Sequence, residues 1–161
     1  MRVRDELCRL IRLNEQNQWV PADEALHQLG HLIGDLISGL VECLCDGHPD
    51  VRRLAVELLV EALPQSTVAA PALIERLKDE DWLVQIAVLT HIGDFGPLAA
   101  EAVSLIEPWL MSLNEYVRLL AASAILKIDL RRAELRPIIW DATASENPVV
   151  RDVAWEVIKG K

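Results

Sequence analysis

Cysteines and basic residues are scarce in this sequence of 161 residues, and each shortage narrows its class. The three cysteines, Cys8, Cys43 and Cys45, are an odd number, which argues against a disulfide framework and for a cytoplasmic protein. Lysine and arginine number 16 against 25 aspartates and glutamates, so the formal net charge is −9. Because a nucleic-acid binder carries a basic surface, we expect neither a nucleic acid nor an anionic membrane as a partner.

Long hydrophobic runs are also missing. Apolar stretches such as residues 54–60 are short, and Glu57 interrupts that one, whereas a membrane-spanning helix needs about 20 apolar residues. The N-terminal segment contains Asp5 and Glu6 and therefore lacks the apolar block of a signal peptide. We expect a cytoplasmic chain without a membrane-spanning segment.

Motifs that carry catalysis or hold cofactors are absent as well. The sequence contains no GxSxG, CxxC, P-loop or GxGxxG pattern. The acidic run at residues 79–81 is typical of a solvated turn that precedes a helix. His27 and His31 share one helix face and Asp35 follows one turn later, but two glycines interrupt that helix, so we predict surface histidines and no metal site. We therefore predict a protein that is not an enzyme and binds no cofactor.

The composition does supply a hydrophobic core. Apolar residues make up 52% of the chain and charged residues 25%, which excludes general disorder. A chain of this length can bury roughly 70% of its unfolded surface, and we expect a single domain over residues 1–161. Cys43 and Cys45 are two positions apart and would point to opposite sides of a helix. We expect both to be buried as small apolar side chains.

The strongest pattern is an internal repeat with a period of 33 residues. Three apolar columns recur at that step without insertion: Val51, Val84, Val117 and Val150; Leu59, Ile92, Ile125 and Ile158; and, upstream, Leu40, Leu73, Ile106 and Ile139. Such columns indicate a chain built from repeated structural units. The repeats span residues 38–70, 71–103, 104–136 and 137–161, and a degenerate first repeat at residues 5–37 precedes them.

Each unit is predicted to form two helices. Apolar residues in the second half of the second repeat follow the 3.6-residue period of a helix, at Val51, Leu54, Ala55, Leu58 and Leu59. Side chains that can cap a second helix stand just before it in the later units, at Asp81, Asn114 and Asn147. No strand pattern competes, so the sequence predicts an all-α fold. Because one two-helix unit cannot bury its own apolar stripe, we expect the units to stack into a right-handed α-α superhelix.

The units resemble the short HEAT repeats of the bilin-lyase type. The resemblance rests on HPDVRRLAVELL at residues 48–59 and ALIERLKDEDWLVQIAVL at residues 72–89, and on the matching segments at 114–125 and 147–158. The ankyrin and tetratricopeptide repeats have similar periods, but their sequence patterns are absent. The resemblance implies a HEAT-like solenoid of about five repeats in a bacterial protein.

The same family carries an acid in the inter-helix turn and an arginine in the second helix, which bond along the stack. The corresponding positions here are Arg52, Gln85, Arg118 and Arg151 for the arginine, and Asp46, Asp79, Ser112 and Ser145 for the acid. Only the second repeat, residues 38–70, has both residue types. The resemblance therefore implies a structural ladder of hydrogen bonds between repeats at these positions, rather than a ligand site.

In HEAT solenoids the second helices line a concave face that a partner can reach. The middle of that face is apolar here and its ends are charged, as in a protein interface; packing of the same side chains against neighbouring repeats is the alternative. Two aromatic residues at inter-helix turns are candidate anchors along one edge. The predicted partner-binding residues are Arg53, Glu57, Ile86, Thr90, Leu119, Ser123 and Leu126 on the face, and Trp82 and Tyr116 at the edge.

Together these features predict a non-enzymatic scaffold or adaptor that binds another protein on its concave face. One alternative is a bilin-lyase-like subunit of a chromophore-attaching enzyme. Another is an acidic inhibitor or immunity-type protein that neutralises a basic partner, which the net charge of −9 favours. A homodimer through the last unit, where Trp155 lacks a covering repeat, also stays open.

Overall fold

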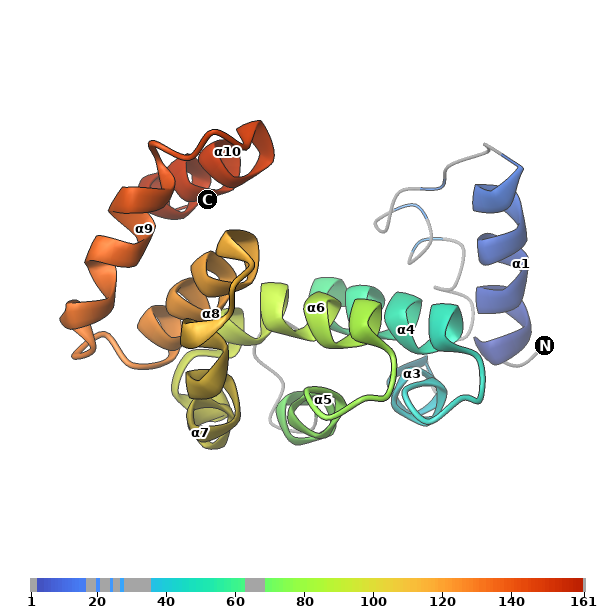
Figure 1. The fold of residues 1–161 in the computed structure, drawn as a ribbon. Helices are drawn as coiled ribbons and strands as arrows, with labels where there is room; N and C mark the ends of the chain where they lie inside the picture. The colour runs from blue at the N-terminus through green and yellow to red at the C-terminus, as the bar shows by residue number, and fades with distance from the viewer. Residues whose placement is uncertain are drawn as a thin grey trace. The chain divides into compact units, whose positions relative to one another are not determined.

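A computed structural model describes residues 3–16, 20, 24, 27, 36–62 and 69–160 of the protein. Within these ranges the chain forms helices, turns and bends and no strand, which confirms the all-α prediction. The helices (Figure 1) divide into two compact structural units, each larger than a single repeat. Unit one is Met1–Val88, and unit two is Leu89–Lys161. The single domain and the right-handed superhelix stay predictions.

Unit one contains the helices of the first repeats. They are α1 (Val3–Glu15), α3 (Leu36–Cys43), α4 (Pro49–Ala62), α5 (Ala69–Arg76) and α6 (Trp82–His91), whose last residues cross into unit two. Helices α1, α3 and α4 pack against one another, and fully buried leucines such as Leu7, Leu40 and Leu58 fill the space between them. Helices α1 and α3 approach so closely that a Cβ atom on Gly39 would lie 2.6 Å from Val3 Cγ2.

Unit two is organised around α8. Its elements are η2 (Ile92–Ala102), α7 (Val103–Ile106), η3 (Glu107–Met111), α8 (Glu115–Ile128), η4 (Ala133–Leu135), α9 (Arg136–Ala142) and α10 (Pro148–Lys159), where η marks a 3₁₀ helix. Helix α8 packs against η2, η3, α9 and α10. A Cβ atom on Gly93 would come within 3.1 Å of the Ala124 Cα atom, so the glycine permits the close approach of η2 to α8.

The predicted caps begin three of the second helices. The Asp81 carboxylate accepts the Leu83 N–H at 2.9 Å, and the side chains of Asn114 and Asn147 accept the N–H two residues further on at 3.0 Å. Each side-chain oxygen satisfies a backbone donor that has no partner inside its own helix. These caps confirm the predicted starts of the second helices.

The first helix of the fourth repeat is less regular than the sequence predicts. It is replaced by α7 and η3. The 3₁₀ helix η2 precedes it, and inside η2 the backbone of Gly96 takes a φ of 51° and a ψ of −135°. By length and composition alone, the stretch Trp82–Met111 could cross a membrane, although the sequence was expected to contain no apolar stretch of that length. It is not one straight helix, because it bends at Gly96, and its Phe95 and Ala99 are buried in the protein core.

Candidate functional site

The same pair of hydrogen bonds holds the four described turns that lead into the second helix of a repeat. The arginine-column side chain donates to the backbone carbonyl of the acid-column residue six positions earlier: Arg52 to Asp46, Gln85 to Asp79, Arg118 to Ser112 and Arg151 to Ser145, at 2.5–2.8 Å. The acid-column side chain accepts the backbone N–H two residues later, at His48, Asp81, Asn114 and Asn147. The two columns therefore shape each turn from within, which the resemblance did not imply.

The predicted ladder between repeats is present in unit one. The Arg52 guanidinium donates to both carboxylate oxygens of Asp79, at 2.9 and 2.7 Å, and both side chains are buried. Burial acts to raise the pKa of Asp79, but the hydrogen bonds from Arg52 and from the Asp81 N–H prevail and hold that pKa below its ordinary value. The ion pair joins two consecutive turns of unit one.

Two further turns are connected to a neighbouring helix or turn by residues outside the two repeating columns. The Arg4 side chain of α1 donates to the Asp46 carboxylate at 2.5 Å, and the Ser145 hydroxyl donates to Glu115 Oε1 at 2.7 Å. Neither Arg4 nor Glu115 belongs to the two repeating columns, so the column pattern missed them. The Ser145–Glu115 hydrogen bond places the turn before α10 beside the turn before α8 in unit two.

Exposed apolar side chains gather on the turns. In unit one Trp82, a predicted edge anchor, is 50% exposed and lies next to the exposed Leu83. In unit two Met111 is 85% exposed and Leu113 is fully exposed, and Val149 is exposed on the neighbouring turn. The second predicted anchor, Tyr116, is half-buried on the same pair of turns. We call the four residues Met111, Leu113, Tyr116 and Val149 the unit-two edge.

The residues predicted for the concave face lie in different surroundings. In unit one Arg53 and Glu57 are half-buried and form an ion pair with each other at 2.8 Å. Ile86 is half-buried, and Thr90, close to the boundary between the units, is exposed. The residues of the predicted face are therefore divided between the two units.

The outward position predicted for Leu119 is wrong. Its side chain is 0% exposed, Ser123 is only 7% exposed, and Leu126 is half-buried. Nine of the 14 residues of α8 are buried, because η2, η3, α9 and α10 all pack against this helix. A helix that is covered on several sides has no single outward face.

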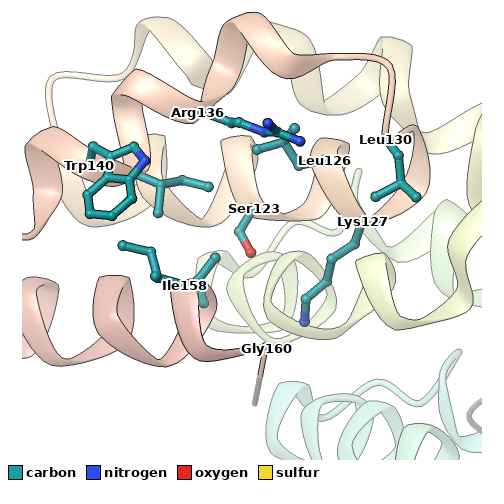
Figure 2. Close-up of a pocket in the computed structure, with 10 residues that line it drawn as sticks. Ser123, Leu126, Lys127, Leu130, Arg136, Trp140, Ile158 and Gly160 are labelled. Atoms are coloured by element: carbon teal, nitrogen blue, oxygen red, sulfur yellow. The ribbon is translucent and has the colours of Figure 1, made fainter.

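Two of these residues line a cavity between α8, α9 and α10. The cavity has a volume of about 440 Å³ and lies entirely in unit two. Figure 2 shows the Ser123 side chain inside it, with Trp140 and Ile158 on one side and Lys127 and Leu130 on the other. The complete lining is Ser123, Leu126, Lys127, Leu130, Arg136, Ile139, Trp140, Val157, Ile158 and Gly160.

Side chains that can bind a metal stay apart in the described part of the chain. No group of three or more His, Cys, Asp or Glu side chains comes together within the described ranges. His27 is exposed, whereas His31 and Asp35 lie outside those ranges. Cys43 is buried as expected, and burial raises the pKa of its thiol to about 11. The expectation of burial was wrong for Cys45, which is exposed in the turn after α3.

The repeated turn module and the paired helices define a helical-repeat protein. The HEAT repeats family matches residues 37–125 and again residues 70–159, and this chain belongs to that family. No curated protein matches the chain. HEAT repeats are commonly protein-interaction scaffolds and are typically non-catalytic.

Proposed function

We propose that the protein is a non-enzymatic scaffold that binds a partner protein through the unit-two edge. The observation that carries this proposal is the exposure of Met111, Leu113 and Val149 on neighbouring turns of a HEAT-repeat unit. Apolar side chains gathered on an exposed surface are typical of protein interaction sites. The hydrogen bond between Ser145 and Glu115 keeps the two turns together, so the edge is ordered before a partner arrives.

Charge around the edge indicates the kind of partner. Glu146, beside Val149 on its turn, and Asp152, one helical turn further along α10, are both exposed. An apolar centre with an acidic rim suits a protein that presents apolar side chains within a basic rim. The overall net charge of −9 acts in the same direction and would speed the encounter with such a partner.

The test compares two variants of the full chain in affinity capture. Leu113→Asp combined with Val149→Asp places charge on the edge, whereas Leu98→Asp changes an exposed leucine of η2 and serves as the control. We expect a protein captured by the wild type to be retained by Leu98→Asp and lost from the double variant. The captured protein is then purified, and its affinity should fall as salt rises, because exposed charges are screened.

Two results would overturn the proposal. Equal capture by the wild type and the double variant would show that the edge is not the interface. Loss from Leu98→Asp alone would place the interface on η2 instead. Circular dichroism of each variant establishes that its helices are intact, which we expect because all three leucine and valine side chains are exposed.

A further inference from the structure

The cavity between α8, α9 and α10 lies away from the unit-two edge. The edge residues Leu113 and Val149 stand at the N-terminal ends of α8 and α10, whereas the cavity is lined by the C-terminal halves of the same helices. Helix α8 has 14 residues and rises about 1.5 Å per residue, so its two ends are about 20 Å apart. The cavity is therefore a separate feature that the proposed scaffold function does not use.

A polar group inside the cavity lacks a partner. Ser123 is 7% exposed, and its hydroxyl makes no hydrogen bond with any residue in the described part of the chain. Figure 2 shows this oxygen directed into the space between α9 and α10. Among the described residues, Arg76 Nε is the only fully buried side-chain polar atom without a partner, so the Ser123 hydroxyl is reached by solvent in the cavity. There it can bind an oxygen atom of a molecule that enters.

Two cations border the same space, and they differ in availability. Lys127 Nζ donates to Asp94 Oδ1 at 2.7 Å, so its charge is already paired. Arg136, at the start of α9, is exposed and makes no ion pair or side-chain hydrogen bond within the residues that the structure describes. An arginine presents several N–H donors in a plane that matches a carboxylate. Arg136 therefore gives the cavity an unused site for a negative charge.

The remaining lining is apolar and suits a hydrocarbon body. Leu126, Ile139, Trp140, Val157 and Ile158 line the walls. The volume of about 440 Å³ falls within the range of small-molecule sites, roughly 300–1,000 Å³, which combine apolar walls with a few polar groups. The Trp140 ring makes an edge-to-face contact with the ring of Trp155, with ring centroids 6.4 Å apart. The ring is thus held in place as part of the wall.

We propose that this cavity binds a small amphipathic carboxylate, with its apolar body between α8 and α10. The carboxylate accepts hydrogen bonds from the Arg136 guanidinium, and the Ser123 hydroxyl donates to a ligand oxygen. Two cations and no carboxylate side chain line the cavity, so an anionic ligand is favoured over a cationic one of the same size.

The test measures binding of decanoate and of decanol, which share a chain and differ in charge, by titration calorimetry on the full chain. We expect decanoate to bind with a Kd below about 1 mM and decanol to bind about tenfold more weakly, because a charge-assisted hydrogen bond contributes at least that factor. Arg136→Gln should weaken decanoate about tenfold and leave decanol unchanged. The matched control is Arg131→Gln, which removes a nearby exposed arginine outside the cavity.

A second variant tests the location. Ser123→Leu fills the interior of the cavity and removes the hydroxyl, so binding of both probes should be lost. If this variant loses its helical circular dichroism, Arg136→Gln decides alone, because Arg136 is exposed and its change should leave the fold intact. The proposal is overturned if decanoate does not bind at about 1 mM, if decanol binds as tightly as decanoate, or if Arg136→Gln and Arg131→Gln have equal effects.

Discussion

Arg52 and Asp79 are 27 residues apart and form a buried ion pair with two hydrogen bonds, at 2.9 and 2.7 Å. Arg52 also donates to the backbone carbonyl of Asp46 at 2.8 Å. One side chain therefore closes its own turn and attaches it to the turn of the next repeat. Because charges that leave water need well-placed partners, this arrangement makes the relation between the two repeats specific.

Replacing Arg52 should destabilise the protein strongly. Arg52→Met removes both guanidinium hydrogen bonds to the buried Asp79 carboxylate and leaves it with Arg76 Nη1 at 3.6 Å. The expected loss of unfolding free energy is about 3 kcal/mol, the lower end of the range for a broken buried ion pair. The double variant Arg52→Met/Asp79→Leu removes both charges and should recover the part of that loss that comes from the broken ion pair. It does not restore the hydrogen bonds that Arg52 and Asp79 make within their own turns. Urea unfolding monitored by circular dichroism measures both effects. The control is Arg53→Met, whose half-exposed pair with Glu57 should contribute less than about 1 kcal/mol.

A pH dependence is expected from Asp129 at the end of α8. The hydrogen bond from the Arg131 side chain, aided by the Arg131 N–H, lowers the pKa of Asp129 from 3.8 to about 2. Because this pKa is lower in the folded state, the stabilisation is complete above about pH 4 and is lost as the pH falls towards about 2. Asp129→Asn should flatten stability across that window, as measured by urea midpoints. The same substitution at the exposed Asp141 serves as the control; an equal change there would contradict the assignment.

Two leucines of unit two should respond oppositely to the same change. Leu119 is 0% exposed and Leu113 is fully exposed. Leu119→Asp would bury a charge without a partner and should abolish the cooperative thermal transition of unit two. Leu113→Asp should shift stability by no more than about 0.5 kcal/mol. Thermal melts followed by circular dichroism give the comparison, and a stable Leu119→Asp protein would show that α8 is not covered as described.

Glycine should be required at position 96 but not at position 47. Gly96 has a φ of 51°, a conformation that side-chain-bearing residues rarely adopt, although a Cβ atom there would meet open space. Gly96→Ala should therefore destabilise by about 1–3 kcal/mol through backbone strain alone. A Cβ on Gly47 would also meet open space, without a positive φ, so Gly47→Ala should be close to neutral. Denaturant midpoints of the two variants measure the difference, and equal midpoints would argue against a strained turn.

Local features of the sequence predicted the repeat and its turns well. The caps at Asp81, Asn114 and Asn147 are where the spacing placed them, because an N-cap depends on the few residues around it. The resemblance to HEAT repeats, which pair an acid of one turn with an arginine of a second helix, predicted the hydrogen-bonded ion pair between Arg52 and Asp79. Glycine and proline interrupt helices, and at the Gly96–Pro97 pair the backbone of Gly96 does leave the helical conformation.

The candidate site was predicted less well, and α8 shows the reason. Its sequence EYVRLLAASAILKI is apolar on nearly all sides, a signal that a helix is covered on more than one face. The repeat spacing instead predicted an outward column that placed Leu119 on the surface. Ser123 and Leu126 were assigned to the same column, but they line a cavity. Arg136, whose charge is available to a ligand in that cavity, does not belong to any of the repeating columns.

The sequence by itself determined the period of 33 residues, the helical class, the turn caps and the net charge, since each depends on residue type and on spacing along one chain. Tertiary structure alone decided which side of α8 is covered, that a cavity lies between α8, α9 and α10, and that Ser123 and Arg136 border it. These outcomes depend on how closely separate helices approach, as at Gly93 and Ala124. Packing of that kind is a property of the assembled unit, because it involves residues far apart in the chain.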